Sequence, residues 1–159
     1  MLIISVSVDK ISPETYPGLR SWIEELNAIR ATPVNIVMAV EDDNVMGIMV
    51  WEPGHLIYLV VPEVSRECGA GRFLVKYLLQ QSEGNVAWCK VLPTAVDAIC
   101  FFHKLGWQIQ SWYTDHADRR YFRMTNAVPQ SSTIPSEETH LEAFASSVPI
   151  FLSMAGGIY

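Results

Sequence analysis

Short hydrophobic runs, separated by polar turn sequences, predict four strands in the first part of the chain. Residues 2–8 alternate and are rich in β-branched side chains, which is typical of a strand. Residues 34–40 and 45–51 are two further β-rich runs, and the polar sequence between them at 41–44 favours a hairpin. The run at 56–61 is continuously apolar, which predicts a strand that is buried on both faces.

Hydrophobic residues at helical spacing predict helices between and after these strands. The segments with this spacing are 12–31, 72–81 and 93–105. In the first segment Ser12 is suited to the N-cap position, and the Pro17-Gly18 pair is expected to divide the segment into two helices. A further strand at 86–91 and a final hairpin of 107–113 with 121–125 complete the pattern.

The sequence changes in character after residue 125. Residues 126–140 lack apolar periodicity and resemble a linker, whereas 141–159 form an apolar tail that is too short to span a bilayer. We therefore expect a domain at 1–125 and an extension at 126–159. Because exposed apolar side chains are unfavourable in water, we expect residues 141–159 to dock on the domain, on a second copy or on another protein.

Composition narrows the range of functions. The 159 residues are 50% hydrophobic, which fits a single globular domain with a sizeable core. A formal net charge of −6 argues against broad electrostatic binding of nucleic acid or of an anionic membrane. Because no run of about 18 apolar residues predicts a membrane span, we expect a cytoplasmic protein.

The three cysteines, Cys68, Cys89 and Cys100, are an odd number at unrelated spacings. This pattern predicts free thiols in a reducing compartment and no metal site. Cys89 and Cys100 stand in apolar runs and are expected in the core, whereas Cys68 is expected to be a small turn residue.

The stretch VVPEVSRECGAGRFLVKYL at 60–78 joins the buried strand to the next helix. Gly69 and Gly71 permit close backbone approach and positive φ angles. Arg66 and Arg72 flank the turn with charges that reach phosphate oxygens. A glycine turn at the start of a helix also exposes backbone N–H groups at the positive end of the helix dipole. The stretch therefore predicts a local phosphate site, although it lacks the features of a Walker loop or a Rossmann fingerprint.

The spacing Arg66-x-x-Gly69-x-Gly71, after a strand that ends in VVP, resembles the pyrophosphate-binding motif of the GNAT family of N-acetyltransferases. A second segment, AICFFHKLGW at 98–107, resembles the final core helix of that family, often written A-x-x-F-Y-x-x-L-G-F. The two motifs occur in family order, and the order of the predicted elements over residues 2–125 is also similar to that of the family.

This resemblance implies a mixed α/β, GNAT-like fold with a largely antiparallel central sheet flanked by helices. It implies that acetyl-coenzyme A lies between two strands that splay apart, here 56–61 and 86–91. The strand backbone would pair with the pantetheine arm, and the turn would hold the pyrophosphate. The residues implied for cofactor binding are Val60, Val61, Arg66, Cys68, Gly69, Ala70, Gly71 and Arg72.

The implied reaction is direct transfer of acetyl to an amine, which is a small molecule, a peptide N-terminus or a lysine side chain. A general base must take a proton from this amine. His55, at the start of the buried strand, is the first candidate, Glu52 is the second and Glu63 the third. Phe102 stands where many family members have the tyrosine that protonates the departing thiolate. Because phenylalanine cannot donate this proton, we expect any turnover to be slow.

Two other functions stay open at this point. One is a catalytically weak or inactive GNAT-fold protein that serves in an assembly, for example as a structural protein of a virion, and docks through residues 141–159. The other is a sensor that binds coenzyme A without turnover. Binding of coenzyme A and acetyl transfer are the two measurements that separate these hypotheses.

Overall fold

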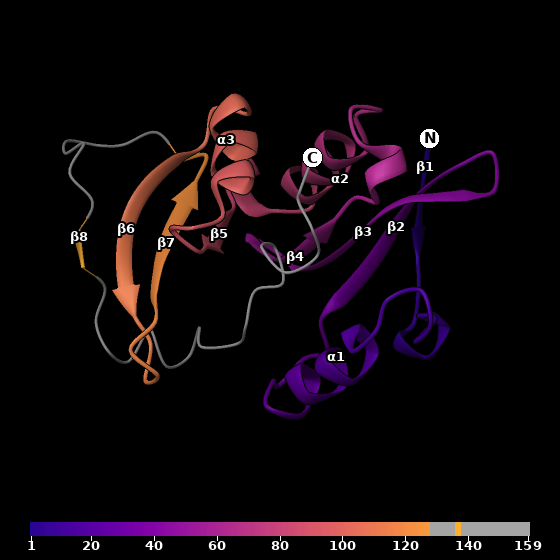
Figure 1. The fold of residues 1–159 in the computed structure, drawn as a ribbon, viewed down its shortest axis with the longest axis horizontal. Coiled ribbons are helices and arrows are strands. Elements are labelled where there is room, and N and C mark those ends of the chain that lie inside the picture. Colours follow the sequence, from indigo (N-terminus) through magenta and orange to yellow (C-terminus); the bar gives the residue numbers. More distant parts are fainter. Residues whose placement is uncertain (128–135, 138–159) are drawn as a thin grey trace.

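The computed structural model describes residues 1–127 and 136–137. A mixed sheet runs through its centre in the strand order β1-β2-β3-β4-β5-β7-β6-β8 (Figure 1). The strands are β1 Leu2–Ser5, β2 Asn35–Glu41, β3 Asn44–Glu52, β4 His55–Val60, β5 Trp88–Val91, β6 Gln108–Thr114, β7 Arg120–Thr125 and β8 Ser136–Glu137. The helices are α1 Leu19–Ala28, α2 Ala70–Gln80 and α3 Val96–Lys104, with short 3-10 turns at Val8–Lys10, Glu63–Ser65 and Glu83–Asn85.

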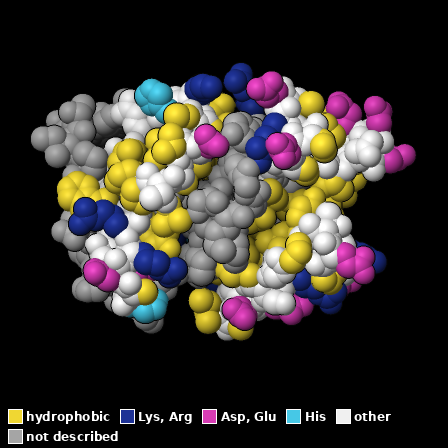
Figure 2. All heavy atoms as spheres, in the orientation of Figure 1, with side chains coloured by type: hydrophobic (Ala, Val, Ile, Leu, Met, Phe, Trp, Pro, Cys, Tyr) yellow, Lys and Arg dark blue, Asp and Glu magenta, His cyan; other side chains and the backbone are white. Residues whose placement is uncertain are grey.

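Strands β1 to β4 form one continuous antiparallel half of the sheet. The hairpin of β2 and β3 turns through Asp42 and Asp43, whose φ angles are 49° and 64°. Two left-handed residues in a row twist the turn in the same sense as the strands, and short polar side chains tolerate that conformation. The predicted hairpin is confirmed. Figure 2 shows acidic side chains gathered at its tip.

The two halves of the sheet meet at a short parallel seam between β4 and β5. Within the described residues, two pairs join these strands, His55 with Trp88 and Leu56 with Cys89. Directly after Leu56, Ile57 is an extra residue that has no register partner in β3. Such a bulge bends a strand. Beyond the bulge β4 and β5 no longer pair, as the resemblance implied.

Helices cover the two faces of the sheet unequally (Figure 1). On one face α2 and α3 bury a core that spans both halves of the sheet and includes Leu74, Cys89 and Phe102. On the other face α1 packs through Trp22 and Ile23 against β2, β3 and β4. The predicted mixed α/β architecture, a largely antiparallel sheet flanked by helices, is confirmed.

The segment 12–18 differs from the prediction that a helix begins at Ser12. It consists of turns, in which Ser12 Oγ accepts a hydrogen bond from the Thr15 backbone N–H at 3.3 Å. Helix α1 begins only at Leu19, after Gly18 with a φ of 77°. Pro17 has no backbone N–H to continue a helix that starts at Ser12, so the capping interaction closes a single turn.

The prediction that Cys100 is a core residue is wrong. Cys100 is exposed, whereas Cys89 is buried as predicted, and all three thiols are free. The buried positions of α3 are Ala98 and Phe102, which are four residues apart and therefore share one side of the helix. Cys100 lies two residues from each, on the opposite side.

Strand β7 ends at Thr125, and the domain boundary at this residue stays a prediction. In the predicted linker, Ser136 and Glu137 form β8 and pair in parallel with Ser111 and Trp112 of β6. The predicted docking tail at 141–159 lies outside the described residues.

Candidate functional site

Beyond the seam, one edge of β4 carries backbone groups with no strand partner. None of the described residues pairs with Ile57–Val60 on the side of β5, although β3 pairs with Tyr58–Val60 on the other side. Leu59 and Val60 are buried. Because buried backbone N–H and C=O groups nearly always have partners, this edge suits an extended ligand that pairs with it as a strand does.

The end of β4 leads into a turn whose backbone is suited to an anion. After the 3-10 turn at Glu63–Ser65, Glu67 and Gly69 have φ angles of 67° and 82°. Gly69 is the N-cap of α2, and within the described part of the chain no side chain caps this helix. An uncapped helix start leaves backbone N–H groups free at the positive end of the helix dipole.

The glycines and arginines of this turn have distinct surroundings. A Cβ on Gly69 would meet no atom within 4 Å, so the positive φ rather than lack of space favours glycine there. Gly71 is buried in the first turn of α2. Arg66 is half-buried and Arg72 is exposed. The residues predicted for cofactor binding lie at two adjoining places, Val60 and Val61 at the end of β4, and Arg66, Cys68, Gly69, Ala70, Gly71 and Arg72 around the start of α2.

Strand β3 and helix α2 approach each other closely beside the turn. A Cβ on Gly47 would lie 3.0 Å from Leu74 Cδ1 and 3.2 Å from the Val60 carbonyl oxygen. Glycine at this position therefore lets α2 start against the end of β4. Gly47 is not among the predicted site residues, although a glycine inside a β-rich run is a sign of close approach by another backbone or element.

At the other end of β4, His55 and Glu52 come together. His55 Nδ1 lies 3.4 Å from Glu52 Oε2, and Arg30 Nε donates a hydrogen bond to Glu52 Oε1. The side chain of His55 is 12% exposed and that of Glu52 is 31% exposed. Glu63, the third predicted base, is exposed in the turn after β4 and does not join the pair.

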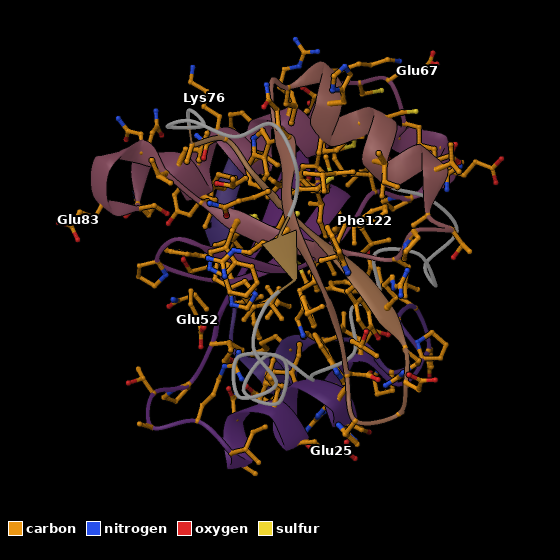
Figure 3. The ribbon with its side chains drawn as sticks, turned by 90° about the vertical axis from the view of Figure 1, so that its left-hand side faces the viewer. Glu25, Glu52, Glu67, Lys76, Glu83 and Phe122 are labelled. Carbon is orange, nitrogen blue, oxygen red and sulfur yellow. The ribbon has the colours of Figure 1, made fainter. Side chains whose placement is uncertain are left out.

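Figure 3 shows where Glu52 lies relative to the two sides of the sheet. Glu25 on α1 points away on one side and Lys76 on α2 on the other, with Glu52 between the two levels. His55 and Val60 are the ends of one strand, and five residues of extended backbone span about 17 Å. The predicted base and the predicted phosphate turn therefore stand at opposite ends of β4.

The surroundings of the pair fix its charge state near neutral pH. The hydrogen bond from His55 lowers the pKa of Glu52 to about 2, with Arg30 acting in the same direction and burial opposing both. Burial lowers the pKa of His55, and the Glu52 carboxylate opposes that shift. The pair is therefore an ionised carboxylate beside a neutral imidazole.

Aromatic and cationic side chains extend this site across β5 and β7. The His55 ring stacks on Trp88 with 3.9 Å between centroids and 7° between planes, and the guanidinium carbon of Arg123 lies 4.2 Å from the Trp88 centroid. Buried Lys90 has its Nζ 5.5 Å from the Tyr113 ring centroid. Trp88, Lys90 and Arg123 are not among the residues predicted from sequence. Their alternation along two paired strands is the signal that places them on one face.

Phe102 lies in the core of the α2 and α3 face. It is fully buried, and its ring centroid is 4.9 Å from that of Trp107 and 5.1 Å from that of Phe101. The position that resembles the family's acid tyrosine therefore holds an apolar packing residue in this chain.

Two further classes of site were sought in the described part of the chain. No group of three or more His, Cys, Asp or Glu side chains there is arranged to hold a metal ion. None of the helices in that part is both long and apolar enough to cross a membrane.

Solved structures with a similar fold include several acetyltransferases. A Bacillus subtilis acetyltransferase in complex with CoA has a TM-score of 0.61 and 14% identity, covering 80% of this chain and 98% of its own. A GNAT family acetyltransferase from Elizabethkingia anophelis with acetyl-CoA bound has a TM-score of 0.59 and 13% identity, covering 80% and 97%. An IAA acetyltransferase from Bacillus cereus has a TM-score of 0.57 and 16% identity, covering 78% and 97%.

These similarities define the class of the fold. No protein-family model and no curated protein matches the sequence. At 13–16% identity the structural similarity shows a shared fold. The chain has the fold of the GNAT superfamily of N-acetyltransferases, so the resemblance seen in its two sequence motifs is confirmed at that level.

Proposed function

We propose that this protein binds acetyl-coenzyme A along β4 and transfers the acetyl group to an amine. The observation that supports this most directly is the run of unpaired backbone in β4 that leads into an uncapped glycine turn at the start of α2. A thioester cofactor with an amide-rich arm and a pyrophosphate has the two chemical features that these places suit. Structures of similar fold with CoA or acetyl-CoA bound support the same assignment.

The cofactor would lie in one direction along β4. The backbone at Val60 and Val61 would pair with the amides of the pantetheine arm, and the backbone N–H groups from Cys68 to Arg72 would hold the pyrophosphate. The exposed Arg72 would add a charge-assisted contact to a phosphate oxygen. The thioester would then lie towards the seam, where the His55 end of β4 is located.

The transfer itself needs few groups from the protein. A neutral amine attacks the thioester carbonyl carbon, a tetrahedral oxyanion forms, and the carbon–sulfur bond breaks to release the thiolate. Holding the two reactants in this geometry supplies much of the acceleration, and a base removes the extra proton of the amine. The acceptor class is a small-molecule or peptide amine, and His55 is the proposed base, with Glu52 beside it.

Calorimetric titration with coenzyme A tests the binding half of this proposal. Arg72→Glu replaces an exposed cation at the start of α2 with an anion, so we expect affinity to fall by about tenfold or more. Lys76→Glu is the matched control, because it makes the same change of charge at an exposed position one turn later in α2. Equal loss in both variants would indicate bulk electrostatics, and no binding by folded wild-type protein at millimolar ligand would contradict the proposal.

Substitution of Phe102 tests whether the missing acid limits the rate of acetyl transfer. Because phenylalanine donates no proton to the departing thiolate, Phe102→Tyr should raise the rate of acetyl transfer by up to about 10²-fold, the lower end of general acid catalysis. Release of free thiol from acetyl-coenzyme A measures this rate. A variant that is folded and no faster than wild type would show that the position does not limit turnover.

The assembly hypothesis remains the second candidate, and Phe102 is the observation that favours it. A protein that had lost catalysis would keep the fold while losing the acid. The two candidates differ in cofactor dependence, because an assembly protein without a coenzyme A site would show neither binding nor thiol release. The tail at 141–159, through which such a protein would dock, is tested by deletion after residue 127 and measurement of oligomeric state.

A further inference from the structure

The second inference rests on the proposed function and concerns how the acceptor loses its proton. We infer that Glu52 holds His55 as the tautomer with hydrogen on Nδ1, so that Nε2 accepts the proton of the acceptor amine. Arg30 is the positioning residue for Glu52. Glu52 is thereby assigned as a positioning residue and not as the base itself.

The contacts of Glu52 carry the first step. Its two carboxylate oxygens face different donors, Oε1 towards Arg30 Nε and Oε2 towards His55 Nδ1 at 3.4 Å. A carboxylate accepts hydrogen bonds and has none to donate when ionised, so Nδ1 of a neutral His55 must carry the hydrogen. The 3.4 Å separation is longer than an optimal hydrogen bond, and catalytic contacts commonly shorten when the reactants are bound.

The other ring nitrogen carries the second step. Nε2 of His55 is buried and, among the residues that the structure describes, has no hydrogen-bond partner. A buried polar atom without a partner is unfavourable and calls for a reason. Our explanation is that Nε2 is unprotonated and accepts a proton from an amine bound beside β4, the strand proposed to bind acetyl-coenzyme A.

The surrounding backbone fixes the ring. Gly54, directly before His55, donates its N–H to Ser82 Oγ at 2.8 Å and accepts a hydrogen bond from the Trp88 N–H at 2.9 Å. The Trp88 ring then covers one face of the imidazole. The hydrogen bonds of Gly54 hold the backbone, and the stacked indole holds the ring, so Nε2 points in one direction. A general base needs a fixed orientation of this kind.

Three charged groups, Glu52, Arg30 and Lys90, act on the imidazole, and a fourth, Arg123, lies against the Trp88 ring that stacks on it. Glu52 lies at the end of β3 and Arg30 just after α1, while Lys90 lies on β5 and Arg123 on β7. Burial, Lys90 and Arg30 lower the pKa of His55, and Glu52 raises it. The low pKa keeps the imidazole neutral near pH 7, and Glu52 stabilises the imidazolium that forms when the proton arrives.

The proton balance is simple. The amine nitrogen forms a bond to the acetyl carbon and passes one proton to Nε2, and the carbon–sulfur bond breaks to leave the coenzyme A thiolate. The imidazolium returns to the neutral form when it gives that proton to the thiolate or to water. The products are the acetylated amine and free coenzyme A.

The tautomer is tested by long-range proton–nitrogen NMR of the isotope-labelled protein. The chain has four histidines, and His55→Gln identifies the signals of this one. We expect Nδ1 to be protonated and Nε2 unprotonated above the pKa of His55. We expect Glu52→Gln to lower that pKa and Arg30→Met to raise it. A hydrogen on Nε2, or a pKa that neither variant moves, overturns the inference.

The proton transfer is tested by thiol release from acetyl-coenzyme A with glycinamide, spermidine and a short peptide as probe amines. His55→Gln should lower kcat by about 10²- to 10⁴-fold, and the exposed His103→Gln serves as the control. In the pH–rate profile, the acid limb should move to lower pH in Glu52→Gln and to higher pH in Arg30→Met. A merely structural role for Glu52 would move no limb.

The outcomes distinguish this inference from the function on which it rests. Wild-type rates in His55→Gln, or an unmoved acid limb in Glu52→Gln, overturn the dyad while leaving acetyl transfer intact. Coenzyme A binding without transfer to any probe amine contradicts the assigned proton acceptor. Failure to bind coenzyme A contradicts the proposed function, and the NMR result on the tautomer is independent of it.

Discussion

The two faces of the same sheet are built differently. The face under α2 and α3 is apolar across both halves and continues over the seam through Leu56, Cys89 and Phe102. The face under α1 is apolar beneath β2, β3 and β4. Beyond the seam, this second face carries His55, Trp88 and Arg123 in a stack.

The apolar face under α2 and α3 holds the two halves of the sheet together. Only two parallel residue pairs join the halves in the described part of the sheet, so backbone pairing alone holds them weakly. The apolar core under α2 and α3 bridges the seam and stabilises the junction by burial. The opposite face carries charged and aromatic side chains at this junction.

The largest expected effect comes from breaking the bridging core. Phe102→Ala removes a fully buried ring from the face that joins the halves, and should lower the free energy of unfolding by about 3–5 kcal/mol. Phe101→Ala is the control, because this neighbouring ring is only half-buried and should cost clearly less. Urea denaturation measures both values. Similar losses in the two variants would contradict the unequal roles of the two rings.

The sequence predicted those features whose conformation is set by a short local stretch of residues. The hairpin at Asp42 and Asp43 and the glycine turn at Gly69 are short stretches whose backbone conformation is set by their own residues, and both were predictable. The helix proposed at Ser12 failed because Pro17 ends the capped turn. The seam depends on a bulge at Ile57, for which a continuously apolar run gives no sign.

The candidate site shows the same limit. Glu52 and His55 are three residues apart, and each was a candidate base from sequence. The proposed division into a positioning residue and a base depends on Arg30, which is 22 residues from Glu52 in the sequence. The stack of Trp88 and Arg123 likewise requires the register of β5 and β7. Tertiary contacts of this kind are not encoded in any local pattern.

The second prediction concerns acid stability on the site face. The pKa of Glu52 falls from 4.5 to about 2 on folding, so the carboxylate stabilises the fold above pH 4.5 and loses this effect as the pH falls towards 2. A shift of this size corresponds to about 3 kcal/mol, which screening at a side chain that is 31% exposed reduces to about 1–2 kcal/mol. His55, with its lowered pKa, adds a loss that begins as the pH falls below 6.5.

Unfolding free energies between about pH 7 and 3 check this prediction. Glu52→Gln should lower stability at neutral pH and flatten the decline below pH 4.5, while the decline that begins near pH 6.5 persists. The exposed Glu24→Gln is the matched control and should lower the curve by no more than the roughly 0.3–0.5 kcal/mol of its ion pair with Arg20. A wild-type curve that is flat over this range would show that the pair has no differential effect on the folded state.

The smallest expected effect comes from the outer ion pair of α1, and it sharpens the contrast with the inner one. Arg20 Nε lies 3.3 Å from Glu24 Oε1, and the two side chains are 40% and 53% exposed. Solvent-exposed pairs four residues apart on a helix contribute about 0.3–0.5 kcal/mol, so Arg20→Met should change stability by no more than that.

Arg30→Met removes the partner of the less exposed Glu52 and leaves a carboxylate with one donor fewer, so its loss of stability should be larger. Added salt should diminish the Arg20 effect first, because screening acts most strongly on exposed charges. Equal losses in the two variants, with equal sensitivity to salt, would contradict this contrast. Solvent would then screen the Glu52 carboxylate as strongly as it screens the Glu24 carboxylate on α1.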